Sequence, residues 1–89
     1  EASLFKIKVY PNPFIEKVTV DYELPVDAKI TIVVSDALGR KVETLVDIKQ
    51  PAGNYTAEFY ENGGYFVYFV TTFINDKIVN SKKLIHVKK

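Results

Sequence analysis

The sequence has no cysteine, no methionine and no tryptophan among its 89 residues. The absence of cysteine excludes a disulfide framework, a thiolate metal site and a cysteine nucleophile. No apolar run approaches the roughly 18 residues of a membrane-spanning helix, and no basic segment precedes an apolar one, so we expect neither membrane insertion nor an intact signal peptide. A chain of this length forms one domain at most, too small for a large active-site cavity.

The sequence has almost no excess of one charge over the other, since 12 basic and 11 acidic residues leave a net charge of +1. This balance argues against a nucleic-acid-binding module and against a polybasic membrane binder. The distribution is uneven, because the segment from Lys77 to the C-terminus has five lysines and no acid, whereas residues 1–76 carry a net charge of −4. The sequence therefore predicts an acidic-leaning body with a basic C-terminal strand.

The composition favours strands over helices. Val, Ile and Thr supply 26 residues, whereas Leu and Ala supply only ten, and β-branched residues suit a pleated, half-buried surface. Period-two alternation between turn signals predicts seven short strands, and hence an all-β fold, a seven-stranded Greek-key β-sandwich. The expected strands cover residues 5–9, 18–24, 28–35, 40–48, 55–60, 65–73 and 77–88.

Two turns have specific sequence signals. Asp36-Ala37-Leu38-Gly39 predicts a type I turn, in which the Asp36 carboxylate accepts a hydrogen bond from the backbone two residues on and Gly39 takes a positive φ. Asn75-Asp76 predicts a two-residue hairpin loop.

The sequence contains no arrangement typical of catalysis or of metal binding. Nucleophilic or acid–base chemistry needs several side chains that converge in a cleft, and the eleven carboxylates lack the spacing of a calcium loop. His86 is the single histidine, and a lone strand histidine is more often a packing or surface residue than a ligand. We expect no catalytic residue, no metal site and no cofactor.

The sixth expected strand is apolar on both faces, which is unusual for a sandwich strand. If Phe66, Tyr68 and Val70 face the core, the alternate residues face outward. An outward apolar stripe favours contact with a partner or a second copy. This candidate contact stripe consists of Tyr65, Val67, Phe69 and Phe73.

Five segments carry a more specific signal. They are residues 9–14 (VYPNPF), 22–25 (YELP), 36–42 (DALGRKV), 52–55 (AGNY) and 82–88 (KKLIHVK). In this order and spacing, and ending at the C-terminus, they resemble the type A C-terminal sorting domain of type IX secretion, from about Phe5 to Lys89.

This resemblance implies an immunoglobulin-like sandwich at the C-terminus of a larger secreted protein of a Gram-negative, Bacteroidota-type bacterium. It implies no chemistry: the domain folds in the periplasm, the outer-membrane secretion machinery recognises it, and a sortase-like peptidase removes it. The N-terminal passenger domain is then attached to the cell surface or released. Because the chain does not begin with Met, we expect residues 1–4 to be a linker from that passenger and residues 5–89 to be the sorting domain.

The resemblance also places recognition on particular residues. Two prolines fix the shape of a loop, and Gly39 sets a turn that projects the planar fork of Arg40. We expect the terminal strand to have an unpaired edge that adds to another sheet. We also expect that removal of residues 82–89 leaves the fold largely intact. The predicted recognition residues are Pro11, Asn12, Pro13, Gly39, Arg40, Lys82, Lys83, Lys88 and Lys89.

Two other functions stay open on the residues alone. One is a carbohydrate-binding module, in which exposed aromatic rings stack on sugars. The other is a structural spacer that self-associates, and no nucleic-acid partner is expected for any of the three. The aromatic residues available for stacking are Tyr60, Tyr65, Phe66, Tyr68, Phe69 and Phe73.

Overall fold

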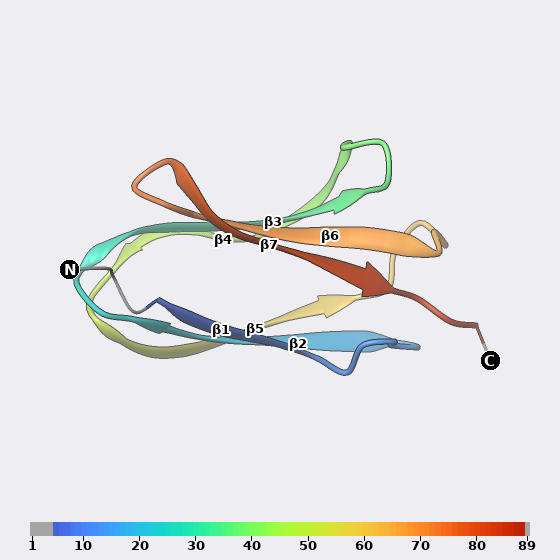
Figure 1. Ribbon diagram of the computed structural model, residues 1–89, viewed down its shortest axis with the longest axis horizontal. Coiled ribbons are helices and arrows are strands. Elements are labelled where there is room, and N and C mark those ends of the chain that lie inside the picture. The colour runs from blue at the N-terminus through green and yellow to red at the C-terminus, as the bar shows by residue number, and fades with distance from the viewer. Residues whose placement is uncertain (1–4, 89) are drawn as a thin grey trace.

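The computed structural model describes residues 5–88, which form seven strands and no helix. No helix in this range is therefore long and apolar enough to cross a membrane. The predicted all-β class and the number of strands are confirmed (Figure 1). The strands are β1 (Lys6–Tyr10), β2 (Lys17–Leu24), β3 (Ala28–Asp36), β4 (Lys41–Gln50), β5 (Gly53–Tyr60), β6 (Val67–Ile74) and β7 (Lys77–Ile85).

The strands form two antiparallel sheets that lie one above the other (Figure 1). One sheet has the order β1-β2-β5 and the other has the order β4-β3-β6-β7. The sandwich is elongated, with extents of 41 × 22 × 21 Å. Several predicted boundaries were wrong by up to three residues. β6 begins at Val67 rather than at Tyr65 and β7 ends at Ile85 rather than at Lys88, whereas β4 continues to Gln50 and β5 begins at Gly53.

The core lies between the sheets and follows the period-two pattern of the sequence. In β3, Ile30, Ile32 and Val34 are fully buried, while the intervening side chains are half-buried on the outer face. Alternate residues of a strand point to opposite faces, so each strand contributes one row to the core. The fully buried residues of the other strands include Val18, Val20, Phe59, Tyr68, Val70 and Leu84.

Both specific turns have the predicted geometry. The amide of Leu38 donates to the Asp36 carboxylate at 2.9 Å, and Gly39 has a φ of 85°. Asn75 and Asp76 both have positive φ, at 50° and 68°, as a two-residue hairpin of the mirror-image type requires.

β1 and β2 belong to the same sheet, but residues 11–14 between them reach across to the end of β7 at the edge of the other sheet, and we call them the crossing segment. The peptide bonds that precede Pro11 and Pro13 are cis. Phe14 then pairs in parallel with His86, just beyond β7. The Phe14 amide donates to the carbonyl of Ile85, and the amide of Val87 donates to the carbonyl of Phe14, both at 2.9 Å.

Phe14 also fills one end of the core. It is only 1% exposed, and its ring centroid lies 6.3 Å from Phe59, 5.9 Å from Tyr68 and 5.0 Å from the His86 ring. These rings come from both sheets and from the segment after β7. Aromatic rings at such separations stabilise a core beyond the area they bury.

Phe66 was expected to face the core with Tyr68 and Val70, and for Phe66 this was wrong. Its side chain is 65% exposed, because the strand alternation starts only at Val67. Phe14, Tyr68 and His86 occupy the core at this end instead.

Replacement of Phe14 by alanine is expected to lower the free energy of unfolding by about 3–5 kcal/mol, because it leaves a cavity among buried rings. Denaturant unfolding of both proteins measures the loss. The neighbouring Ile15→Ala is the control, because Ile15 is exposed and should change stability by roughly 0.5 kcal/mol or less. Equal effects of the two substitutions would show that Phe14 does not hold the sheets together.

Candidate functional site at the distal end of the sandwich

The predicted recognition residues within the described range lie at the same end of the sandwich. Antiparallel pairing brings the end of β1, the β3–β4 turn, the start of β6 and the end of β7 together there, on the right in Figure 1. We call this the distal end. β1 begins at the opposite end, where Lys6 pairs with Glu23. Lys89 lies outside the described residues.

Asn12 joins the crossing segment to the C-terminal strand. Its side-chain amide nitrogen donates to the carbonyl of Lys83 at 2.9 Å, and its amide oxygen accepts from the backbone amide of Ile85 at 2.9 Å. The side chain thereby takes the place of a neighbouring strand along β7. Pro11 and Pro13 flank Asn12 and are exposed. Because proline has no backbone N–H, neither residue offers a donor that would compete for these bonds.

The expected free edge of the terminal strand was therefore wrong for its last residues. Asn12 and Phe14 hydrogen-bond to the backbone of residues 83, 85 and 87. β7 has no neighbouring strand on this edge in the described structure, and the bonds from Asn12 and Phe14 reach only residues 83, 85 and 87. The segment is not separable either, because Leu84 and His86 are buried and removal of residues 82–89 would delete part of the core.

The lysines of the terminal segment face different surroundings. Lys82 is half-buried, whereas Lys83 and Lys88 are exposed. Lys88 places its ammonium 5.5 Å from the centre of the Phe66 ring. No ion pair forms on these three lysines within residues 5–88, so their charges face solvent or a partner.

Arg40 belongs to a turn organised by a buried carboxylate. Asp36 Oδ1 accepts from the amides of Leu38 and Arg40, each at 2.9 Å, and Oδ2 accepts from Arg40 Nε at 2.8 Å. Burial raises the pKa of Asp36, but these bonds and the guanidinium charge outweigh it, so the pKa lies below the ordinary value of 3.8. The Arg40 side chain is still 64% exposed. It therefore both completes the turn and presents a cation.

His86 is a packing residue that links three segments of the distal end. It is buried, with Nε2 at 2.9 Å from the carbonyl oxygen of Ile15 and Nδ1 at 3.0 Å from that of Tyr65. A neutral imidazole donates from one nitrogen and an imidazolium from both. Its backbone amide donates to the carbonyl of Phe66 at 2.8 Å. These contacts tie the end of β7 to the loops that precede β2 and β6.

The candidate contact stripe is divided between two surfaces. Val67, Phe69 and Phe73 alternate with the buried residues of β6 and lie half-buried on the outer face of the four-stranded sheet. Tyr65 precedes β6 and lies instead beside the β3–β4 turn. Tyr68, one of the aromatics considered for sugar stacking, is fully buried and has no accessible ring face.

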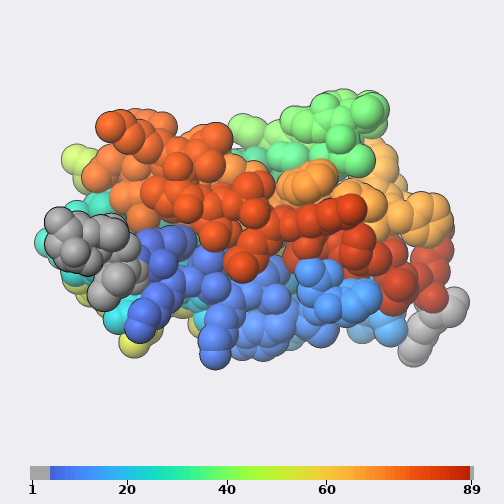
Figure 2. Space-filling view, in the orientation of Figure 1, coloured from blue at the N-terminus to red at the C-terminus, as the bar shows by residue number. Residues whose placement is uncertain are grey.

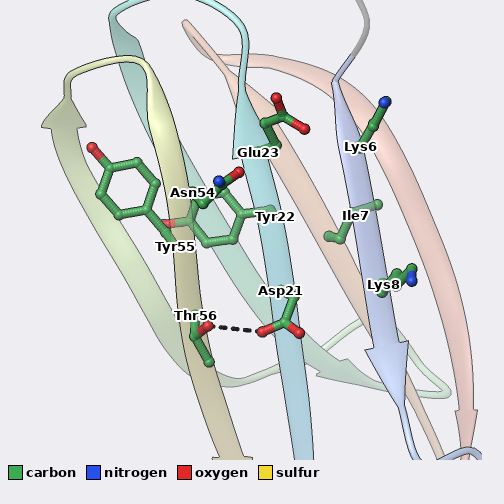
Figure 3. Close-up of a pocket in the computed structure, with 9 residues that line it drawn as sticks. All are labelled: Lys6, Ile7, Lys8, Asp21, Tyr22, Glu23, Asn54, Tyr55 and Thr56. Carbon is green, nitrogen blue, oxygen red and sulfur yellow. Dashed lines mark hydrogen bonds between the residues drawn. The ribbon is translucent and has the colours of Figure 1, made fainter.

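The three-stranded sheet carries a shallow trough on the opposite layer (Figure 3). Asp21 on β2 accepts hydrogen bonds from Tyr10 on β1 and Thr56 on β5. The Asp21–Thr56 bond is drawn in Figure 3, where Lys6 and Lys8 point away from it. Two polar groups of the trough, those of Asp21 and Thr56, thus bond to each other. Across residues 5–88 no three His, Asp or Glu side chains gather as a metal site would require.

The fold and this assembled end define a β-sandwich domain with a basic C-terminal strand. The family model described as "Secretion system C-terminal sorting domain" matches residues 8–88, so the chain belongs to this family. It is a non-catalytic C-terminal sorting signal for type IX secretion. Comparisons with curated proteins and with solved structures find no match.

Membership of this family indicates the partners of the domain and the destination of the exported protein. A sorting signal of this type implies interaction with the type IX secretion machinery and with an N-terminal passenger. It also implies secretion, or export to the cell surface, from a Bacteroidetes-type cell.

Sequence reasoning missed several residues that build the distal end. Phe14 and His86 carry core contacts across about 70 residues of sequence, and no local pattern reports such pairing. Sequence reasoning assigns Leu38 no role beyond its turn, and the structure shows that this large apolar side chain is 78% exposed. Large apolar side chains are uncommon at a turn that needs only small polar residues, and this was the one available signal.

Replacement of Asn12 by alanine is expected to weaken the hold on β7 without unfolding the domain. The amide of Ile85 loses its acceptor and should exchange with deuterium about tenfold faster, the effect of one hydrogen bond. The His86 amide, which donates to Phe66, serves as the internal reference. Asn54→Ala, at an exposed site on β5, is the control. Unchanged exchange at Ile85 would mean that the Asn12 bonds contribute nothing.

The Asp36 carboxylate is expected to make stability depend on pH. Because its pKa is lower in the folded chain than its ordinary 3.8, it stabilises the fold above that value, and the stabilisation is lost as pH falls through the folded pKa. Asp36→Asn should therefore differ most from the unmodified chain near neutral pH, with a gap that narrows in acid. Urea unfolding across pH measures this, with Glu43→Gln as the control. A gap independent of pH would contradict the role of the charge.

Proposed function

We propose that the secretion machinery recognises the distal end of the folded sandwich as an assembled surface rather than a linear tail. The observation that carries this proposal is the bonding of Asn12 and Phe14 to the last residues of β7. These bonds bring Pro11–Pro13 to the same end as the Gly39-Arg40 turn and Lys82, Lys83 and Lys88.

The separation of the two ends supports this assignment. β1 begins at the end opposite the distal end of a sandwich 41 Å long. A passenger joined before residue 5 is then held away from the recognition surface. Residues 1–4 act as the linker to that passenger, and residues 5–89 as the sorting domain.

The strand order supports an immunoglobulin-like Greek-key topology. β1, β2 and β5 lie in one sheet and β4, β3, β6 and β7 in the other, so the chain alternates between the sheets as such folds do. The domain folds in the periplasm of a Gram-negative cell, and recognition at the outer membrane follows. A sortase-like peptidase then removes the domain, and the passenger is attached to the surface or released.

The proposal is tested by fusing a periplasmic reporter to residues 1–89 in a host that has the secretion machinery. The reporter should appear outside the cell. Combined Lys82→Gln, Lys83→Gln and Lys88→Gln should lower its export by about tenfold or more, because cations at an interface set association.

The matched control replaces three lysines outside the distal end, Lys6, Lys8 and Lys49, by glutamine and should export as the unmodified fusion does. Retention of the unmodified fusion would contradict the sorting function of this chain. Equal export by the two triple variants would contradict recognition at the distal end.

A further inference from the structure

A second surface at the distal end is built from exposed apolar side chains. A groove runs between the β3–β4 turn and the start of β6, lined by Ala37, Leu38, Tyr65, Phe66 and Val67 with Asp36 and Arg40 at its margin. We call it the Leu38–Phe66 groove. In Figure 2 the turn, in green, and the segment before β6, in light orange, lie at the same end as the red C-terminal segment.

The groove exposes more apolar surface than its turns require. Leu38 is 78% exposed and Phe66 is 65% exposed. Neither side chain is needed to form the local backbone structure. The turn depends on Asp36 and Gly39, and Phe66 bonds to His86 through its backbone carbonyl rather than its side chain. Adjacent exposed apolar residues of this size typically mark a contact site.

Cations stand at both margins of the groove. Arg40 uses Nε for Asp36, and its terminal guanidinium nitrogens have no hydrogen bond within the described chain. Lys88 lies over the Phe66 ring. The one lining carboxylate, Asp36, is buried and its two oxygens already accept three hydrogen bonds. The accessible charge of the groove is therefore positive.

We propose that the Leu38–Phe66 groove binds an extended segment of a partner protein that alternates apolar side chains with carboxylates. Leucine or phenylalanine side chains of the partner pack on Leu38 and Phe66, and a carboxylate pairs with the Arg40 guanidinium, whose planar fork suits that geometry. A membrane surface fits less well, because polybasic lipid contact uses about four to eight clustered cations and the groove has two.

In its biological setting this inference rests on the proposed function. The groove adjoins the end of β7, because Phe66 accepts the His86 amide and contacts Lys88. A partner that holds the terminal segment is then within reach of the groove. Two linked contacts bind more tightly than either alone.

Binding of a synthetic probe tests the groove itself. The probe is a blocked octapeptide that alternates aspartate with leucine or phenylalanine, titrated into the ¹⁵N-labelled 89-residue chain. The amides of Leu38, Tyr65 and Phe66 should shift. A matched peptide with asparagine in place of aspartate should bind about tenfold more weakly, the effect of one charge-assisted hydrogen bond pair.

Three single variants locate the site. Leu38→Ser and Phe66→Ser should each weaken binding of the acidic peptide by about tenfold, since each removes an apolar contact that the bound peptide would bury. Ile78→Ser is the matched control, because Ile78 is 66% exposed but lies at the opposite end of β7, and it should bind as the unmodified chain does. Amide spectra show that each variant is folded.

Several outcomes overturn the proposal. They are an absence of shifts at the groove, equal affinity for the acidic and amide peptides, or equal loss with Ile78→Ser. Binding of phosphatidylglycerol vesicles through Leu38 and Phe66 in the absence of peptide binding also overturns it and assigns the groove to lipid. Export of the reporter fusion is scored separately, so a failed groove leaves the sorting function standing, and failed export leaves the peptide result to decide the groove.

Discussion

The reach of residues 11–14 from their own sheet to the end of β7, at the edge of the other sheet, is the constraint on which the rest of the structure depends. Asn12 replaces a neighbouring strand along the end of β7 through two side-chain hydrogen bonds. Phe14 continues the pairing through its backbone and fills the core with its ring. Asn12 and Phe14 thus bond the β1–β2 connection to the end of the C-terminal strand. Without them β7 would be held by β6 alone.

Under the proposed function, this arrangement makes recognition a property of the folded domain. Lys82 and Lys83 are positioned by the pairing of β7 with β6, and the crossing segment adds bonds to residues 83, 85 and 87. Arg40 reaches the same end only because β3 and β4 pair up to the turn at Asp36. A chain that has not folded offers the machinery the same residues but not the same surface. Under the proposed recognition of the distal end, sorting is thereby coupled to folding.

Local patterns predicted much of the fold. The alternation of Ile30, Ile32 and Val34 gave β3 its buried face, and the turn at Asp36 and the hairpin at Asn75-Asp76 followed from short-range rules. The distal end followed less well, because its contacts join residues about 70 positions apart, as Asn12 and Ile85 are. An asparagine side chain that completes a strand has no periodic signature. The same reasoning placed Phe66 in the core, since alternation alone does not say where a strand begins.

The central claim is that the secretion machinery contacts the distal end of the folded sandwich. A photoreactive amino acid placed at single exposed positions in the full reporter fusion tests it in living cells during export. Leu38 and Val87 sample the distal end, and Val26 and Ile78 are exposed at the opposite end. The account predicts crosslinks to outer-membrane components from the distal positions and none from the opposite ones. Equal crosslinking from both ends, or crosslinking from Val26 and Ile78 alone, would contradict it.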